Sequence, residues 1–434
     1  MSEESKRPYA RRSRNWEFRG RHTIATRPDT DEALQDYFRT AREQKKQMIA
    51  EQVGSATHIA AYAGAGGTGA PWYSIGPRNI FGRVRCLAVD PNDDEIVYAG
   101  AASGGVWKTE NGGDTWRSIF DEEDVLVIGA IAVAPQNANR IYIGTGECVG
   151  SNMPNDIVTY PGDGTYVTIN GGQTWTRAST NSSRCQRILV DHTNQNRALL
   201  AGNRGLEVTT NGGSTWNWHP DTNFQYVEIS DMLRDPVDPN VIYLTTYDPY
   251  ISAGEPLGHG AIWISTDNGL TFSQSSLPGL PTTKYLRLGA GKDVNNPQNS
   301  QAYIRDEQVL FQSNDFGSTW TRLSDPITNQ QLFPTRSHYY TNSFTTNPNK
   351  GHEILYGGQH QGVHMFNLNL GNWNMGALAM NIVYYDTHQF AWAPSNPNRV
   401  YICGDGGVYR SDDCGCGWEE VSDGLMIPPH HNIA

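Results

Sequence analysis

The chain has 434 residues, of which 37% are apolar and 18% charged, the balance of a folded protein with a large core. This composition excludes wholesale disorder, and six cysteines in so long a chain exclude a disulfide scaffold. Residues 1–50 hold 12 Lys and Arg against 8 Asp and Glu, whereas the remainder carries 21 against 37. Because a body so acidic repels nucleic acid, we expect no nucleic-acid partner.

No stretch of the sequence has the roughly 18 apolar residues that a membrane helix needs, so we expect no membrane span. The first residues carry charges where the apolar region of a secretory signal would lie, so the sequence gives no export signal. Localisation therefore stays open.

The N-terminal part predicts three segments before the main fold. Residues 1–28 are a basic extended arm, residues 29–53 an amphipathic helix with a capping box at Asp29 and Glu32, and residues 54–71 a Gly/Ala linker. The arm suits an acidic surface, and it equally suits a solvated tail. Residues 1–53 are thus our candidate for docking or for homo- or hetero-assembly.

From residue 72 onward one eight-residue pattern recurs: Ser/Thr, any, Asp/Asn, any, Gly, any, Thr or Gly, aromatic. We call it the box. Six copies and one worn copy have their aromatic residues 59, 41, 56, 48, 53 and 45 positions apart, and these are Trp116, Trp175, Trp216, Phe272, Trp320, Trp373 and Trp418. Side-chain oxygens that accept backbone N–H groups, a glycine with positive φ and an anchoring aromatic ring are typical of a tight hairpin. The box therefore predicts structure and carries no reaction.

Each box follows the same order of short apolar runs and Pro/Asn turns, which predicts four antiparallel strands per unit. Seven such units predict an all-β fold, a seven-bladed β-propeller over residues 72–434. We expect WYSIG (72–76) to supply the outer strand that joins the last blade to the first.

The boxes resemble those of the Asp-box or BNR-repeat propellers, which include sialidases, sortilin-type receptors, photosystem assembly factors and xyloglucan-cleaving glycosidases. The segments YAGAASGGVWKT (98–109) and DTHQFAWAPSNPNRVYICGDGGVYRS (386–411) are most similar to uncharacterised, mostly exported bacterial proteins labelled glycosyl hydrolases. The sialidase branch carries an Arg-Ile-Pro signature that is absent here, which argues against sialidase activity. The xyloglucan-cleaving relatives have two propellers with the substrate cleft between them, and this chain has one. No catalytic residue is carried over from either group.

Functional residues are expected on one face of the ring. In a four-stranded meander the Pro/Asn turns and the boxes emerge on one face, so the variable loops and the links between blades share the other. A pair of carboxylates for glycosidic hydrolysis could come from that face, and the candidate catalytic residues are Glu147, Asp405 and Asp386. The candidate ligand-binding residues are Arg83, Asp163, Tyr247, Glu255, Arg336, His338, His360 and His388.

Structural roles compete with these assignments, and we favour them for the carboxylates. Glu147 can accept backbone N–H groups of the loop that it opens, and Asp405 in GDGG suits a turn. Neighbouring blades bring His338, His360 and His388 close enough for a zinc site, but no ligand motif supports one, so we predict no metal ligands. We predict no cofactor, leave calcium in the loops open, and expect reduced cysteines by default.

Three functions are consistent with the sequence. The first is a ligand-binding or scaffolding propeller whose loop face takes a glycan or protein, with the arm used for docking. The second is a polysaccharide-active glycoside hydrolase with paired carboxylates. The third is a structural subunit of a larger assembly. We favour the first, because the boxes are complete and no catalytic signature is present.

Overall fold

The computed structural model describes residues 82–148, 160–247, 261–277, 286–306, 309–323, 342–358, 361–369, 372–374, 383–384 and 386–427. The chain divides into two units, Met1–Ser74 and Ile75–Ala434, and all described residues belong to the second. The arm, helix and linker expected in residues 1–71, and the WYSIG segment, lie outside the described residues. Within the part described, no helix is long and apolar enough to cross a membrane.

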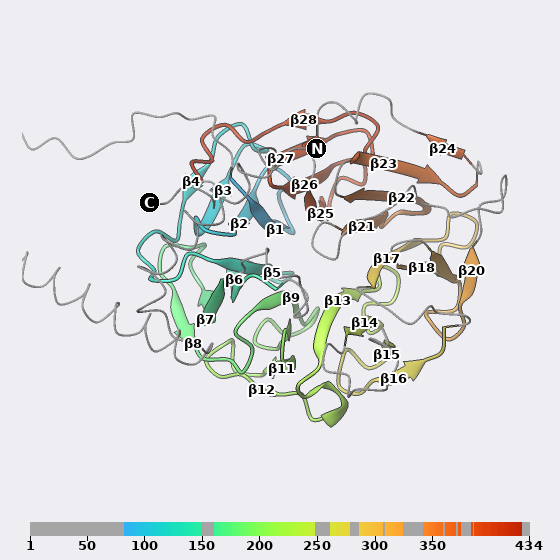
Figure 1. Ribbon diagram of the computed structural model, residues 1–434, viewed down its shortest axis with the longest axis horizontal. Helices are drawn as coiled ribbons and strands as arrows, with labels where there is room; N and C mark the ends of the chain where they lie inside the picture. Colours follow the sequence, from blue (N-terminus) through green and yellow to red (C-terminus); the bar gives the residue numbers. More distant parts are fainter. Residues whose placement is uncertain are drawn as a thin grey trace, which may run out of the picture. The chain divides into compact units, whose positions relative to one another are not determined.

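Seven four-stranded antiparallel sheets form the fold, and each sheet uses four strands that are consecutive in the chain (Figure 1). The first strands of the sheets are β1 (Val84–Val89), β5 (Ile128–Ala134), β9 (Cys185–Val190), β13 (Glu228–Arg234), β17 (Arg287–Lys292), β21 (Asn342–Asn347) and β25 (Thr387–Trp392). The second strands are β2 (Val97–Ala101), β6 (Asn137–Gly146), β10 (Ala198–Gly202), β14 (Ile242–Tyr247), β18 (Ser300–Arg305), β22 (Lys350–Gly358) and β26 (Val400–Gly404). The third strands are β3 (Val106–Thr109), β7 (Pro161–Thr168), β11 (Gly205–Thr209), β15 (Ala261–Ser265), β19 (Leu310–Ser313), β23 (Gln361–Asn367) and β27 (Gly407–Ser411). The fourth strands are β4 (Arg117–Ser118), β8 (Thr176–Ala178), β12 (Asn217–Trp218), β16 (Ser273–Ser275), β20 (Thr321–Leu323), β24 (Asn372–Asn374) and β28 (Glu419–Glu420).

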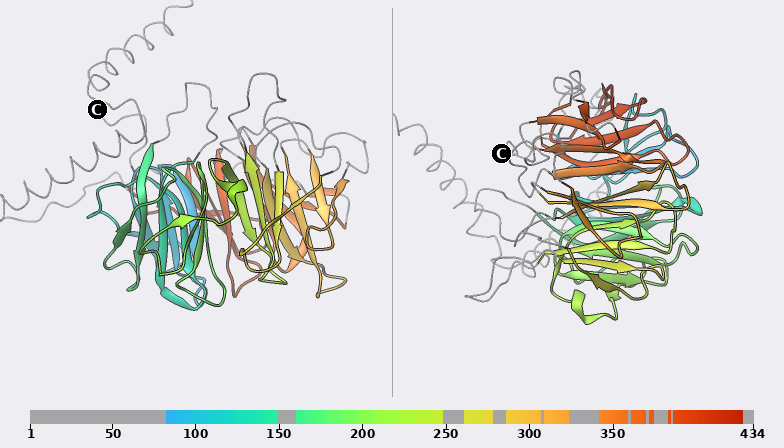
Figure 2. Two further views of the ribbon diagram at one scale, coloured as in Figure 1. Left: turned by 90° about the horizontal axis from the view of Figure 1, so that it is seen from below. Right: turned by 90° about the vertical axis from the view of Figure 1, so that its right-hand side faces the viewer.

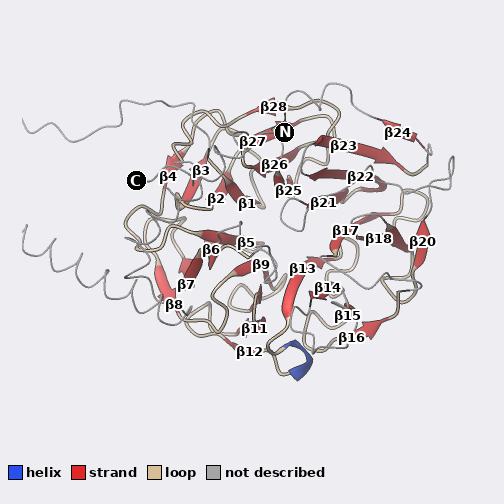
Figure 3. Cartoon of the chain, viewed as in Figure 1, coloured by secondary structure: helices blue, strands red, loops and turns tan. Residues whose placement is uncertain are grey.

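The sheets are the blades of a seven-bladed propeller, as the repeats predict. The first strands of neighbouring blades contact one another around the axis, and the fourth strands lie at the periphery (Figure 1). Seen from the side, the strands run across the thickness of the ring (Figure 2). Strands make up almost all of the described regular structure, and a single turn of 3₁₀-helix, η2 (Thr222–Phe224), links blades three and four (Figure 3).

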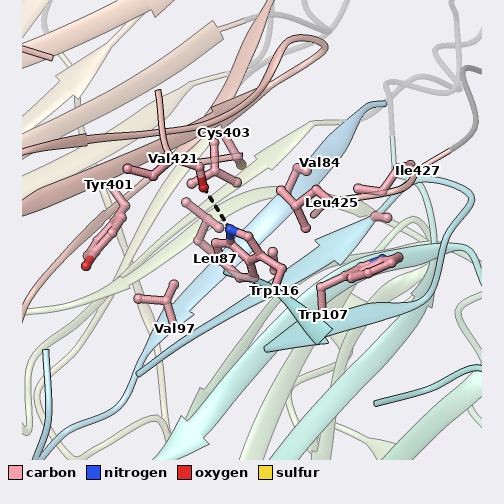
Figure 4. Packing of buried hydrophobic residues seen from close by; sticks show 13 residues of the cluster. Val84, Leu87, Val97, Trp107, Trp116, Tyr401, Cys403, Val421, Leu425 and Ile427 are labelled. Carbon is pink, nitrogen blue, oxygen red and sulfur yellow. Dashed lines mark hydrogen bonds between the residues drawn. The ribbon is translucent and has the colours of Figure 1, made fainter. Parts of the chain in front are cut away.

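The ring is closed by packing between blades. Seven clusters of buried apolar side chains each join one pair of neighbouring blades. The cluster between blades seven and one contains Trp116, whose Nε1–H donates to the carbonyl of Val421 at 2.7 Å (Figure 4). Burying such large apolar side chains contributes about 2–3 kcal/mol each. Interblade packing is therefore what brings distant parts of the sequence to a common axis.

The seventh blade has four described strands of its own. The outer strand of the seventh blade is β28, which follows its own box as the outer strand follows the box in the other blades. Each blade thus takes its four described strands from one continuous segment of chain. The expectation for WYSIG stays a prediction, because residues 72–76 lie outside the described residues.

The box forms the hairpin between the third and fourth strands. In the first blade Thr109 Oγ1 donates to Asn111 Oδ1 at 2.8 Å and accepts from the Gly113 backbone N–H at 3.0 Å. The same Asn111 Oδ1 accepts from the Thr115 backbone N–H at 3.0 Å. Equivalent contacts recur in the boxes of blades two, three, four, five and seven. We call this side of the ring the box face and the opposite side the loop face.

Candidate functional site

Five polar side chains from three blades meet on the loop face, and we call them the axial cluster. Arg83 precedes β1, Arg85 is the second residue of β1, Glu147 follows β6, His388 is the second residue of β25, and Asp405 lies in the β26–β27 turn. All five therefore lie where strands begin or end on the same face of the ring. Four of them are residues that the sequence singles out as candidates.

Asp405 receives hydrogen bonds from two sides. Arg83 Nε donates to its Oδ1 at 2.8 Å and Arg83 Nη2 to its Oδ2 at 3.1 Å, a bidentate pair that joins blade one to blade seven. His388 Nε2 lies 2.7 Å from the same Oδ1. Burial alone would raise the pKa of Asp405, but the hydrogen bonds and charges of His388 and Arg83 outweigh it and hold this pKa well below its usual value. Asp405 is therefore ionised at neutral pH.

His388 is fully buried, and its environment disfavours a positive charge. Burial lowers the pKa of the imidazole, and the cations Arg85 and Arg83 add to this effect against the opposing hydrogen bond to Asp405. At neutral pH the ring is therefore neutral and donates its Nε2 proton to the Asp405 carboxylate. Its role in this arrangement is to orient Asp405.

Glu147 is completely buried and lies between two arginines. Its Oε1 is 3.6 Å from Arg83 Nη1 and 3.6 Å from Arg85 Nε. The backbone of Glu147 forms a bridge with Cys185 at the start of the inner strand β9. Arg83 thus links the two carboxylates Glu147 and Asp405, which are 258 positions apart in the sequence.

The network continues across the axis and includes Gln186 and Arg287, which the sequence analysis did not single out. Arg85 Nη2 donates to the carbonyl of Cys148 at 2.8 Å. With its amide oriented to satisfy its neighbours, Gln186 donates to the same carbonyl at 3.3 Å and accepts from Arg287 Nη1 at 2.8 Å. The Cys148 thiol lies 3.3 Å from Glu228 Oε1. Burial raises the pKa of this thiol, and the Glu228 carboxylate raises it further, so it stays protonated.

An axial cavity of about 180 Å³ is lined by side chains from six blades. Its polar wall includes Gln186, Gln389 and the ion pair between Arg187 Nε and Asp231 Oδ1, 2.9 Å apart. The remaining lining is largely apolar, with Ala130 and Phe344 among it. A cavity of this size with a polar wall holds several water molecules.

The remaining predicted residues have different positions. Asp163 lies inside strand β7, not in a loop, and is buried against the outer strand, where its Oδ2 is 2.8 Å from Arg177 Nε. Tyr247 ends β14 opposite Glu228 and is half-buried. Asp386 is half-buried with φ +63°, and its carbonyl accepts from the Asp405 backbone N–H at 3.1 Å. Outside the described residues lie Glu255, Arg336, His338 and His360.

Metal binding finds no ready ligand set in the part of the chain that the structure describes. No group of three or more His, Cys, Asp and Glu side chains there is arranged to hold an ion. All six cysteines are described, and each is a free thiol. The chemistry that the axial cluster offers is that of carboxylates held by guanidinium groups and one neutral imidazole.

The curated proteins that match the chain in sequence are xyloglucanases. No known family model matches the chain. A xyloglucanase of Hypocrea jecorina is 27% identical over 265 residues, which cover 59% of this chain and 26% of the relative. Xyloglucanase Xgh74A of Acetivibrio thermocellus is 24% identical over 380 residues, which cover 79% of this chain and 38% of the relative. The chain thus matches only a quarter to two-fifths of the length of these curated relatives.

Solved structures agree on the fold. The GH74 xyloglucanase of Xanthomonas campestris has a TM-score of 0.58 at 15% identity, covering 82% of this chain and 56% of its own. The GH74 enzyme of Niastella koreensis has a TM-score of 0.55 at 19% identity, covering 80% of this chain and 55% of its own. The chain thus shares the β-propeller fold with these structures. The proteins that it resembles in sequence are xyloglucanases.

Proposed function

We propose that the propeller acts on a xyloglucan-type polysaccharide at its loop face, as a glycoside hydrolase. The observation that carries this proposal is the similarity to xyloglucanases over as much as 79% of the chain. The position of the candidate carboxylates supports it, because they lie on the loop face and not among the boxes. We also assign the repeats to the Asp-box type, which their shared side-chain contacts support.

Hydrolysis of a glycosidic bond needs a proton donor and an ionised carboxylate, roughly 5 Å apart for retention or 6.5 to 9.5 Å for inversion. Asp405 is the ionised member, because Arg83 and His388 lower its pKa. Asp386 is our candidate for the proton donor. Its backbone carbonyl accepts a hydrogen bond from the Asp405 backbone N–H, and Asp386 is only half-buried. Glu147, with no exposed surface, positions Arg83 and Arg85.

A second candidate function is binding of the polysaccharide without turnover. Its specific support is that both oxygens of Asp405 already accept hydrogen bonds, which makes this carboxylate a weaker nucleophile or base. If the protein binds without turnover, the axial cluster stabilises the loop face, with its arginine and carboxylate charges in balance. The two functions differ in whether new reducing ends appear.

The test measures binding and cleavage in parallel. Purified protein is run through gels containing xyloglucan or another β-glucan, and the same polysaccharides are assayed for release of reducing ends. We expect retardation by xyloglucan with reducing-end release, and a loss of release of at least a hundredfold in Asp386→Asn and Asp405→Asn. Asp163→Asn is the matched control, since that carboxylate faces the outer strand. Retardation without release of reducing ends would favour the binding function. If no β-glucan causes retardation or is cleaved, the hydrolase and the binding function are both contradicted.

A further inference from the structure

The loop face carries exposed aromatic side chains that the axial cluster does not use. Six large apolar side chains of the described residues are strongly exposed, and the two aromatic ones are Tyr226, at 69%, and Tyr384, at 54%. Both lie on links that lead into an inner strand on the loop face. By contrast Ile169, Leu270 and Val294 lie in turns of the box face. The exposed rings are thus on the face where we place the polysaccharide.

Tyr226 is held in an unfavourable backbone conformation. Its φ is +64°, a value that few residues other than glycine adopt and that costs free energy for a bulky side chain. Two contacts impose it: the Tyr226 backbone N–H donates to the carbonyl of Arg204 at 2.6 Å, and Gln225 forms a bridge with Gly205. Since the ring remains largely exposed, its own burial does not offset this cost. Such conformations persist where they serve a function more often than elsewhere.

The Tyr226 ring has an aromatic neighbour. The ring centroids of Tyr226 and Trp218 lie 5.5 Å apart, with the planes tilted by 53°. Gly205, with φ +141°, makes room for this approach, because a Cβ atom there would lie 2.9 Å from Trp218 Cζ3. Trp218 is half-buried, and Arg204 beside the pair is exposed. The result is an apolar surface that carries a phenol hydroxyl, next to the backbone of the exposed residue Arg204.

We propose that Tyr226 and Trp218 form an aromatic platform on which a sugar ring of the polysaccharide stacks. This inference rests on the proposed function. A pyranose ring has an apolar face of C–H groups and a rim of hydroxyls, which matches an aromatic face bordered by polar donors. Arg204 supplies N–H donors to the hydroxyls at the rim.

The platform is separate from the axial cluster. It lies on blades three and four, whereas the contacts of Asp405 join blades seven and one on the other side of the ring (Figure 1). A polysaccharide chain that reaches both must extend across the loop face. The platform therefore contributes to the binding of long chains, remote from the candidate carboxylates.

The test uses two substitutions of one residue. Tyr226→Asn removes the ring and suits the positive φ, because asparagine tolerates this conformation. Tyr226→Phe keeps the ring and removes only the hydroxyl. Leu270→Asn is the matched control, an exposed apolar side chain of the box face with 61% exposure. The dissociation constant for polymeric xyloglucan is measured by calorimetry, together with the thermal unfolding midpoint.

We expect Tyr226→Asn to weaken binding about tenfold, with an unfolding midpoint equal to or above that of the unchanged protein. The dissociation constants of Tyr226→Phe and Leu270→Asn should lie within about twofold of that of the unchanged protein. If the unchanged protein binds xyloglucan and Tyr226→Asn binds equally well, the platform is wrong and the proposed function stands. If the unchanged protein binds none of the β-glucans, both proposals fail.

Discussion

The two faces of the ring differ in whether their side-chain contacts repeat from blade to blade. On the box face the same side-chain contacts recur in six blades, between residues that are two to four positions apart. On the loop face the contacts of Arg83 are particular to their place: they join blade one to Glu147 of blade two and to Asp405 of blade seven, 322 positions away in the sequence. Repetition thus marks what stabilises the ring, and departure from repetition marks where a ligand can be recognised. Substitutions on the two faces should therefore differ in what they change.

The largest effect is expected for Trp116→Ala, which removes a box aromatic. Trp116 is 8% exposed, packs between blades seven and one and donates to the Val421 carbonyl. We expect the free energy of unfolding in urea to fall by about 3–5 kcal/mol because a large cavity replaces the ring. Ile169→Ala, at an exposed box position, should change it by less than about 0.5 kcal/mol. A loss below about 1 kcal/mol for Trp116→Ala would mean that the boxes do not hold the ring together.

The next effect concerns the loop face. Asp405→Asn leaves Arg83 without its bidentate carboxylate, and hydrogen bonds to charged groups contribute about 1.5–3 kcal/mol. We expect the free energy of unfolding to fall by about 2 kcal/mol and reducing-end release from xyloglucan to be lost. The pKa of Asp405 lies below its unfolded value of about 3.9, so its contribution to stability is present above that pH and declines as the pH falls toward the folded pKa. Urea titrations at pH 7 and pH 3.5 measure this, and the difference between the proteins should shrink at pH 3.5.

A smaller effect is expected for Thr209→Val in the third box. Thr209 Oγ1 accepts from the Gly213 backbone N–H at 3.0 Å, and valine has nearly the same shape without the acceptor. Leaving a buried N–H unpaired costs about 1–2 kcal/mol, so stability should fall by that amount while xyloglucan binding stays unchanged. A change in binding with unchanged stability would reverse the roles that we assign to the two faces.

The smallest effect is a change in pH dependence caused by His388→Asn. Because burial lowers the pKa of His388, the unfolded chain takes up a proton below about pH 6.5 that the folded protein resists. Stability should therefore decline as the pH falls from 6.5 to 5, and less steeply in His388→Asn. The buried residues His219 and His364, whose pKa values burial also lowers, contribute to the remaining slope. Identical slopes in the two proteins would show that His388 is protonated equally in both states.

The sequence predicts the blades well because the contacts of each box join residues that are close in the sequence. Eight residues carry the whole hairpin, so seven copies predict seven blades, and the aromatic spacing predicts where each one ends. The same regularity was enough to place β28, since every other box also precedes an outer strand.

The axial cluster was predictable only in part. Chain connectivity places Arg83, Glu147, His388 and Asp405 on one face, but the pairing of Arg83 with Asp405 depends on ring closure across 322 positions. Gln186 and Cys148 lie in unremarkable sequence, and only the converging strands give them their contacts. Asp163 is a candidate on sequence grounds because its neighbours are polar, but β7 begins at Pro161 and takes Asp163 into the blade.

The most direct test of the central claim is a hydrogen-exchange footprint of the full chain with and without polymeric xyloglucan. The account predicts slower exchange at loop-face peptides around residues 83–86, 203–206, 225–228 and 404–407. It predicts unchanged exchange at the box hairpins around residues 109–116 and 411–418. Protection at the box hairpins, or at no loop-face peptide, would contradict it.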